Sequence, residues 1–139
     1  MSKKPYAERN LKFETLQLHV GQEQPDPATG ARIVRTAETN LGDLCADAYR
    51  AVTGADVAMV NGGGVRASIA AGEITYGDII SVHPFGNEVC MVETTGAQIL
   101  DALEMGCSAL PAEFGGFQQV SGLTYEIDMN VDPTVELDE

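Results

Sequence analysis

The sequence predicts an α/β fold, a single domain whose helices pack on a mixed sheet. Three observations lead to this prediction. The chain has 139 residues, which suits one domain. Its strand-like segments alternate with helix-like segments, as they do in α/β domains. Hydrophobic residues make up 44% of the chain, an ordinary share for a globular domain that argues against wholesale disorder.

The first thirty residues are expected to hold a strand and a loop. Residues 14–20 alternate apolar and polar side chains, as a half-buried strand does. Residues 22–30 contain Pro25, Pro27 and a Thr-Gly pair, which together indicate a loop.

A helix is expected next. Apolar side chains recur at helical spacing over residues 41–52, and Thr39 or Asn40 can cap the start of this helix. Asp43 lies in the first turn, where the helix dipole favours an acid. Gly54 suits the end of the helix.

Three elements are expected in the middle of the chain. The apolar run at residues 56–60 predicts a buried strand that ends in three glycines. Residues 74–82 predict a short helix or turn. Residues 88–93 alternate like a strand, and because both of its faces carry apolar side chains, we expect both to be covered.

A second helix and further strands are expected after residue 94. Thr95 and Gln98 have capping-box spacing, so they predict a helix start, and Gly106 is expected to end that helix. Residues 118–129 indicate one or two strands, and the four acids of residues 132–139 indicate a frayed tail or linker. The expected apolar face of this helix consists of Ile99, Leu100, Leu103 and Cys107.

Charge is distributed unevenly along the chain. The net charge is −13, yet residues 1–66 hold all eight basic residues and sum to zero, whereas residues 67–139 hold thirteen acids and no base. This argues against nucleic acid and against an anionic membrane as partners, because both need clustered cations. No apolar run approaches the roughly 18 residues of a membrane helix, and the N-terminus has no apolar signal-peptide core.

Cysteine and histidine spacing indicates no metal site and no disulfide framework. The three cysteines are far apart in the sequence, and we expect Cys45 and Cys90 to be buried as small hydrophobic residues. The two histidines, His19 and His83, are not paired at a ligand spacing. No Ser, His and acid are placed to suggest a nucleophilic triad, so no catalytic apparatus is visible.

Arginines beside glycines are the first candidate for a binding site. Arg66 follows the run Gly62–Gly64, whose backbone a ligand can approach closely, and its guanidinium suits carboxylate or phosphate. The alternative is a structural ion pair beside a tight turn. The run has neither P-loop nor dinucleotide-fingerprint spacing. Arg32 and Arg35 are the other candidate cations.

An aromatic side chain on a turn is the second candidate. Phe85 lies between Pro84 and Gly86, where its ring either stacks on a nucleobase or anchors the loop in the core. Asn87 can donate to and accept from a base edge. Aromatic residues also lie beside glycines at residues 114–117.

Five motifs in order make the chain resemble the C-terminal domain of the 5′-nucleotidase family, over about residues 31–128. That family includes 5′-nucleotidases, UDP-sugar hydrolases and cyclic-nucleotide phosphodiesterases. The motifs are Val34-Arg35-Thr36-Ala37-Glu38-Thr39-Asn40-Leu41-Gly42-Asp43, Asn61-Gly62-Gly63-Gly64-Val65-Arg66, Gly72-Glu73-Ile74-Thr75, Pro84-Phe85-Gly86-Asn87 and Gln119-Val120-Ser121-Gly122-Leu123.

The resemblance implies roles for matching residues. Phe85 would stack on the base and Asn87 would bond its edge. Arg35 and Arg66 would bind the ribose hydroxyls or the anionic end of the substrate. The backbone of Gly115 would line the base pocket.

The chain departs from the family at two places. The family has an arginine four residues before the position of Arg35, where this chain has Ala31 and Arg32 lies one place off. The family's later Gly-Gly-Asp-Gly-Tyr segment, which supplies the second stacking aromatic, has no counterpart here. We therefore expect either a truncated binding domain or a divergent stand-alone one, with a half-built base sandwich.

The resemblance divides the chain into an N-terminal strand and linker (1–30), a binding domain (31–129) and an acidic tail (130–139). It implies a nucleoside- or nucleotide-binding domain of a phosphoric ester hydrolase. Catalysis would require a separate metallophosphatase domain that carries two divalent metals, and no cofactor is expected in this chain. The family suggests a periplasmic, secreted or cell-surface location.

Two alternatives stay open. The first is an interaction or assembly module that kept the fold and lost the ligand, with a homodimer through an exposed sheet edge. The second is a related hydrolase with a non-nucleotide substrate, such as the thiosulfate-releasing branch of the same superfamily.

Overall fold

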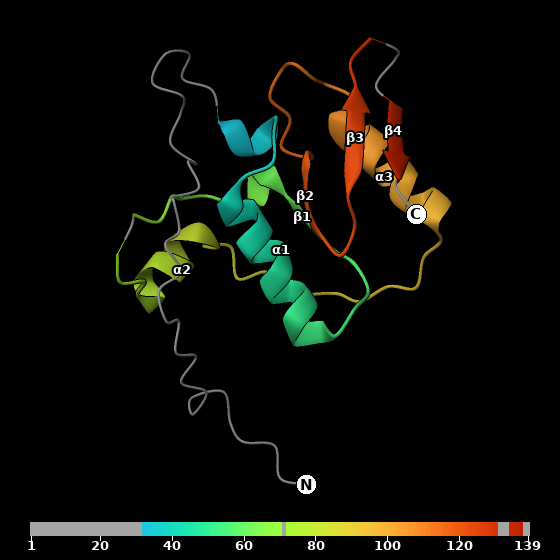
Figure 1. Cartoon of the computed structure of the whole chain (residues 1–139). Coiled ribbons are helices and arrows are strands. Elements are labelled where there is room, and N and C mark those ends of the chain that lie inside the picture. The colour runs from blue at the N-terminus through green and yellow to red at the C-terminus, as the bar shows by residue number, and fades with distance from the viewer. Residues whose placement is uncertain (1–31, 71, 131–133, 138–139) are drawn as a thin grey trace, which may run out of the picture.

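The computed structural model describes residues 32–70, 72–130 and 134–137, so the strand and loop expected before residue 31 lie outside the described residues. Figure 1 shows helices arranged around short strands, which confirms the α/β class. The elements are η2 (Ile33–Arg35), α1 (Asn40–Thr53), β1 (Ala58–Asn61), η3 (Gly62–Gly64), α2 (Tyr76–Val82), α3 (Gly96–Cys107), β2 (Gln118–Ser121), β3 (Tyr125–Asp128) and β4 (Thr134–Leu137).

The described strands form two antiparallel pairs in place of the expected mixed sheet. β1 pairs with β2, with Val60 opposite Gln119, and β3 pairs with β4, with Ile127 opposite Val135. The alternation of strands and helices in the sequence predicted the class of fold but carries no information on strand direction, which long-range pairing decides. β4 also corrects the expected frayed tail, because residues 134–137 are paired.

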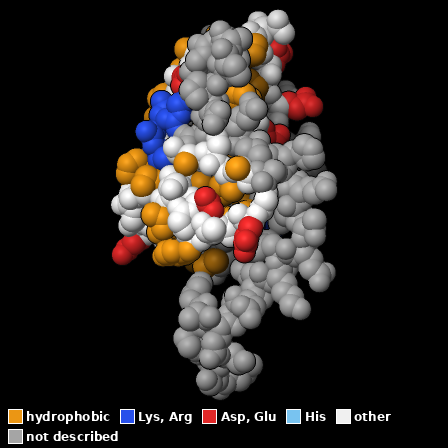
Figure 2. Space-filling model, turned by 90° about the vertical axis from the view of Figure 1, so that its left-hand side faces the viewer, with side chains coloured by type: hydrophobic (Ala, Val, Ile, Leu, Met, Phe, Trp, Pro, Cys, Tyr) orange, Lys and Arg blue, Asp and Glu red, His pale blue; other side chains and the backbone are white. Residues whose placement is uncertain are grey.

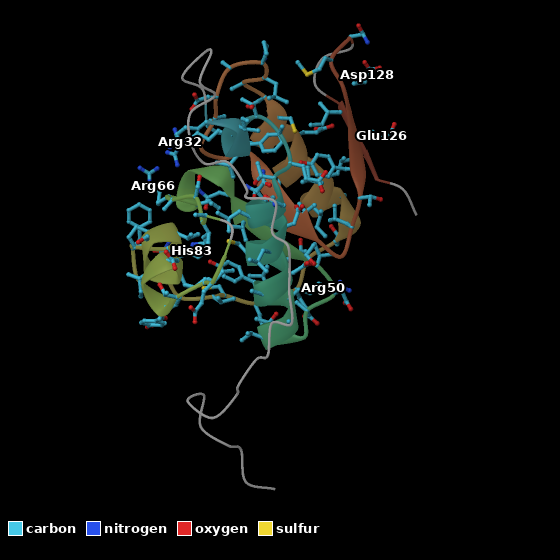
Figure 3. The ribbon with its side chains drawn as sticks, turned by 60° about the vertical axis from the view of Figure 1, so that its left-hand side comes forward. Arg32, Arg50, Arg66, His83, Glu126 and Asp128 are labelled. Carbon is cyan, nitrogen blue, oxygen red and sulfur yellow. The ribbon has the colours of Figure 1, made fainter. Side chains whose placement is uncertain are left out.

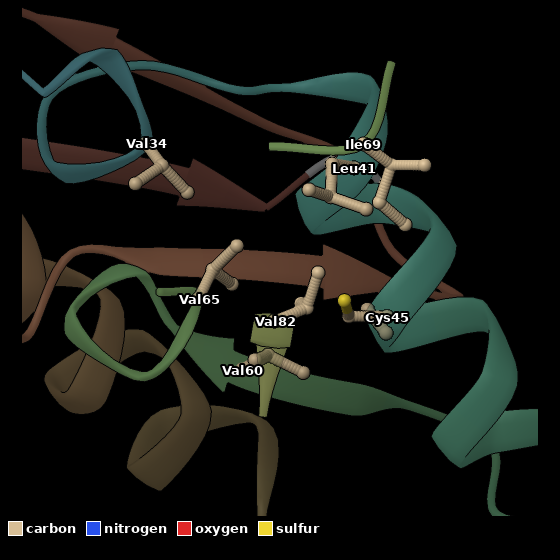
Figure 4. Packing of buried hydrophobic residues seen from close by; sticks show 8 residues of the cluster. Val34, Leu41, Cys45, Val60, Val65, Ile69 and Val82 are labelled. Carbon is tan, nitrogen blue, oxygen red and sulfur yellow. The ribbon is translucent and has the colours of Figure 1, made fainter. Parts of the chain in front are cut away.

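The β1–β2 pair separates two hydrophobic clusters. Successive side chains of a strand point to opposite faces, so Val60 joins one cluster and Met59 the other. The first cluster lies against α1 (Figure 4) and the second against α3. Buried in the first are Val34, Leu41, Cys45, Ala46, Val60, Val65, Ile69 and Val82, and in the second Leu103, Cys107 and Phe117.

The helix ends follow the sequence prediction closely. Thr39 caps α1 by accepting a hydrogen bond from Gly42 N at 3.1 Å, and Gly54 ends this helix at φ 73°. Thr95 and Gln98 form the reciprocal capping box of α3. Gly106 does not end α3, because the helix continues to Cys107. Gly106 is instead buried, and a Cβ at Gly106 would lie 2.9 Å from the carbonyl oxygen of Gly116.

The segment over residues 88–93 corrects a further prediction. It forms no strand, and Val89, Met91 and Val92 are exposed, Val92 to 81%. Cys90 is exposed too, so its expected burial is wrong, whereas Cys45 is buried as expected. The alternating pattern shows that the segment could form a strand, but a strand also needs a partner. No strand in the described part of the chain pairs with residues 88–93.

Gln119 is a buried polar side chain whose amide is fully used. Its Oε1 accepts hydrogen bonds from Thr39 N at 2.9 Å and Thr39 Oγ1 at 3.2 Å. Its Nε2 donates to Val34 O at 3.2 Å and Ala37 O at 2.9 Å. A Cβ at Gly42 would collide with this side chain, so the glycine makes room for it. One amide therefore connects β2 to η2 and to the start of α1.

We expect Gln119→Leu to destabilise the fold by about 2–3 kcal/mol, because it leaves buried backbone groups at Thr39 and Val34 without partners. The matched control is Gln118→Leu, which removes only the bond to Gly116 O and should cost under about 1 kcal/mol. Urea unfolding measures both free energies. Equal losses in the two variants would contradict the role of Gln119.

Asp43 makes the stability of the fold depend on pH. Partial burial, then the negative charges of Glu38 and Asp47, raise the pKa of Asp43 to about 6. The neutral acid is thus favoured in the folded state. Its stabilising contribution is complete below the unfolded pKa, close to 4, and is lost as the pH rises through about 6.

Asp43→Asn should therefore stabilise the chain by about 0.5–1 kcal/mol at pH 7.5, a figure reduced for solvent exposure and for the favourable helix dipole. It should have little effect at pH 4. Thermal unfolding at both pH values measures this, with the exposed Asp101→Asn on α3 as control. A gain that is equal at both pH values would rule out the titration of Asp43 as its cause.

Candidate functional site

Two glycine-containing loops are held together beside the end of β1. Gly62 N donates to Phe117 O at 2.7 Å, and Gly63 N donates to Gly115 O at 2.9 Å. The side chain of Asn61 donates to the same Gly115 oxygen at 3.1 Å. The loops approach so closely that a Cβ at Gly63 would lie 2.9 Å from Gly115 O.

Arg32 and Arg35 project from η2 and its N-terminal flank toward this junction. Arg32 N donates to Glu113 Oε1 at 2.9 Å, and its Nη2 donates to Val65 O at 2.9 Å. Arg35 Nη1 lies 4.0 Å from Glu113 Oε2. Arg35 Nε is buried and has no hydrogen-bond partner among the described residues.

Arg66 lies close to these two side chains, and the three form what we call the arginine cluster (Arg32, Arg35 and Arg66). Figure 3 places Arg32 and Arg66 on the same side of the molecule, and Figure 2 shows basic side chains there beside apolar ones. Burial, then repulsion by Arg35 and Arg66, lowers the pKa of Arg32, while Glu113 acts in the opposite direction. The positive charges are therefore near enough to interact.

Phe85 presents its ring outward under Arg66. Phe85 is 61% exposed, so the interpretation of this residue as an anchor in the core is wrong. Arg66 Cζ lies 5.8 Å from the ring centroid, within cation–π range. Arg66 Nη1 donates to Gly63 O at 3.2 Å, and Arg66 makes no ion pair with a carboxylate among the described residues.

His83 supplies the anchor for the turn that carries Phe85. Its Nε2 lies 3.2 Å from Cys45 Sγ, and its ring lies 5.8 Å from that of Tyr49. Burial lowers the pKa of His83, which a backbone hydrogen bond at Gly64 partly opposes, and burial raises the pKa of Cys45 to about 11. Both shifts favour the neutral forms, and the contacts of His83 fix the start of the turn that carries Phe85 against α1.

The structure brings most of the candidate residues into one connected set. Phe85 contacts Arg66, and the glycine loop that Arg66 bonds is itself bonded to Gly115. Asn87 is exposed two residues after Phe85 and makes no hydrogen bond within the described residues. Sequence reasoning missed Asn61 as a bridge and Glu113 as a neighbour of the arginines.

The described part of the chain has neither a cluster of metal-ligating side chains nor a helix that could span a membrane. No group of three or more His, Cys, Asp or Glu side chains there could hold a metal ion. None of the helices described is long and apolar enough to cross a bilayer.

The chain is similar to proteins of one family. The model of the 5′-nucleotidase C-terminal domain matches residues 19–138. The trifunctional nucleotide phosphoesterase protein YfkN of Bacillus subtilis is 45% identical over 104 residues, which are 72% of this chain and 7% of that protein. A 5′-nucleotidase of Vibrio parahaemolyticus is 43% identical over 96 residues, 69% of this chain and 17% of that protein.

A solved structure is similar as well. The crystal structure of a 5′-nucleotidase precursor from Thermus thermophilus matches with a TM-score of 0.65 and 41% identity, over 73% of this chain and 21% of that one. The chain thus spans a fifth or less of the length of the two curated relatives above and about a fifth of this structure.

We expect Gly63→Ala to separate the two loops and to destabilise the chain by about 1–2 kcal/mol, because the added Cβ meets the backbone of Gly115. Gly64→Ala is the matched control, since its Cβ meets only the side chain of Asn61, at 3.1 Å. Chemical denaturation measures both, and amide NMR shifts at Gly115 report on the loop contact. If the control were as damaging as Gly63→Ala, the close loop approach would not be the cause.

Proposed function

The chain belongs to the 5′-nucleotidase C-terminal domain family, and on that premise we propose that it binds the nucleoside part of a nucleotide for a 5′-nucleotidase-type phosphoric ester hydrolase. The observation that carries this proposal is the exposed ring of Phe85 beneath Arg66, at the border of the arginine cluster. An aromatic face beside guanidinium groups matches a ligand that has both a flat base and an anionic end.

Each candidate residue has a proposed role. The ring of Phe85 stacks on the base, and the free amide of Asn87 bonds the base edge. Arg35 and Arg66 bind the ribose hydroxyls or the phosphate, and Arg32 adds positive charge beside them. The carbonyl of Gly115 already accepts two hydrogen bonds, so its N–H is the group that lines the base pocket.

Hydrolysis itself is assigned to another domain. The relatives named nucleotide phosphoesterase and 5′-nucleotidase are several times longer than this chain. We propose that a metallophosphatase domain with two divalent metals, in the same protein or complex, supplies the attacking water. The present chain positions the substrate.

A second candidate function is an interaction or assembly module, and the exposed apolar segment at residues 88–93 favours it. Exposed apolar side chains that lie together can mark a surface that contacts another protein. Concentration-dependent dimerisation without nucleoside binding would support this candidate over the first.

We expect Phe85→Ala to weaken adenosine binding by at least about 1 kcal/mol, or roughly fivefold, because the stacking face is lost. Tyr76→Ala is the matched control, since Tyr76 is also an exposed aromatic residue but lies on α2. Titration of the labelled chain with adenosine and with AMP, followed by backbone amide shifts, measures the affinities. Equal adenosine affinity of the Phe85 variant and the unchanged chain would exclude the stacking role.

A further inference from the structure

Glu113 is the carboxylate that meets the arginine cluster within the described residues. It precedes Phe114, whose N–H donates to Arg35 O at 3.2 Å, so the backbone holds Glu113 close to Arg35. Arg32 and Arg35 lie on the one turn η2 and its flank, whereas Glu113 comes from the loop before β2.

The two oxygens of Glu113 are engaged differently. Oε1 accepts a hydrogen bond from the backbone N of Arg32 at 2.9 Å. Oε2 lies 4.0 Å from Arg35 Nη1, beyond hydrogen-bond distance, with the two side chains 32% and 26% exposed. A long ion pair open to water is weak. The carboxylate is therefore held mainly by its bond to the backbone of Arg32.

Arg35 has N–H groups that can still donate hydrogen bonds to an acceptor. A guanidinium has five N–H donors in a planar fork that matches a carboxylate or a phosphate. Arg35 Nε has no hydrogen-bond partner in the described part of the chain, but it is buried, so a ligand would approach this 26% exposed side chain through its terminal nitrogens. A ligand oxyanion and Glu113 Oε2 would approach the same guanidinium, and two negative charges that close repel each other.

We propose that Glu113 competes with the anionic group of a ligand for Arg35, so that this domain binds the phosphate of a nucleotide weakly relative to the base and sugar. This inference rests on the proposed function, of which it specifies the ligand preference. A weak hold on the phosphate leaves that group free to be transferred to a reaction centre in another domain. Glu113 is thus a specificity-determining residue that acts through Arg35.

Glu113→Gln tests this competition. Gln keeps an oxygen that can accept from Arg32 N but removes the negative charge. We expect the affinities for inorganic phosphate and for AMP to rise about twofold to fivefold, the range expected from removal of one partly exposed charge. The affinity for adenosine should stay unchanged. Amide shifts near Arg35 on titration with each of the three ligands give these values.

The matched control is Glu126→Gln, which changes the net charge by the same amount on β3, away from the arginines (Figure 3). Thermal unfolding first confirms that both variants fold. The proposal is overturned if phosphate binds Glu113→Gln no more tightly than the unchanged chain, if Glu126→Gln produces the same gain, or if no chain responds to phosphate. Tighter phosphate binding without any adenosine binding would support the role of Glu113 and reject the proposed nucleoside function.

Discussion

The buried amide of Gln119 is the contact on which the rest of this structure depends. It lies on β2, yet its four hydrogen bonds all go to the segment that runs from η2 to the N-cap of α1. These groups sit at helix and turn ends, where backbone donors and acceptors have no partner of their own. The Gln119 amide takes the place of water and supplies the hydrogen bonds that these buried backbone groups need. The position of η2, and with it the arginines, is thereby tied to the central strand pair.

The pairing of β1 with β2 sets the geometry of the candidate site. β1 and β2 are paired in register, so the loops at their adjoining ends must lie side by side, and only glycine permits the approach seen between Gly63 and Gly115. Arg66 then lies between the glycine loop and Phe85. His83 holds the base of that turn against α1. The exposed ring is thus positioned by the Arg66 loop on one side and by the contact of His83 with α1 on the other.

Local features were predictable from the sequence, and long-range ones were not. The cap at Thr39 and the capping box at Thr95 depend on residues three positions away: the sequence predicts the box, and Thr39 is one of the two caps that it offers. Strand direction and the uncovered state of residues 88–93 depend on partners far along the chain. Phe85 could be interpreted in two ways, because whether its ring is exposed depends on how the turn sits on the fold, which its local sequence does not specify. No sequence signal placed Glu113 beside Arg35.

The net negative charge of the chain bears on how the candidate site would attract an anionic ligand. The chain carries a net charge of −13, and at physiological ionic strength salt screens both this charge and the arginine cluster beyond about 8 Å. Glu113 reduces even that local attraction. An anionic ligand is therefore not drawn in from a distance. Under the proposed function, stacking on Phe85 and hydrogen bonds to fixed donors supply the affinity, and the flat base, not the phosphate, is then the part of the ligand that this surface selects.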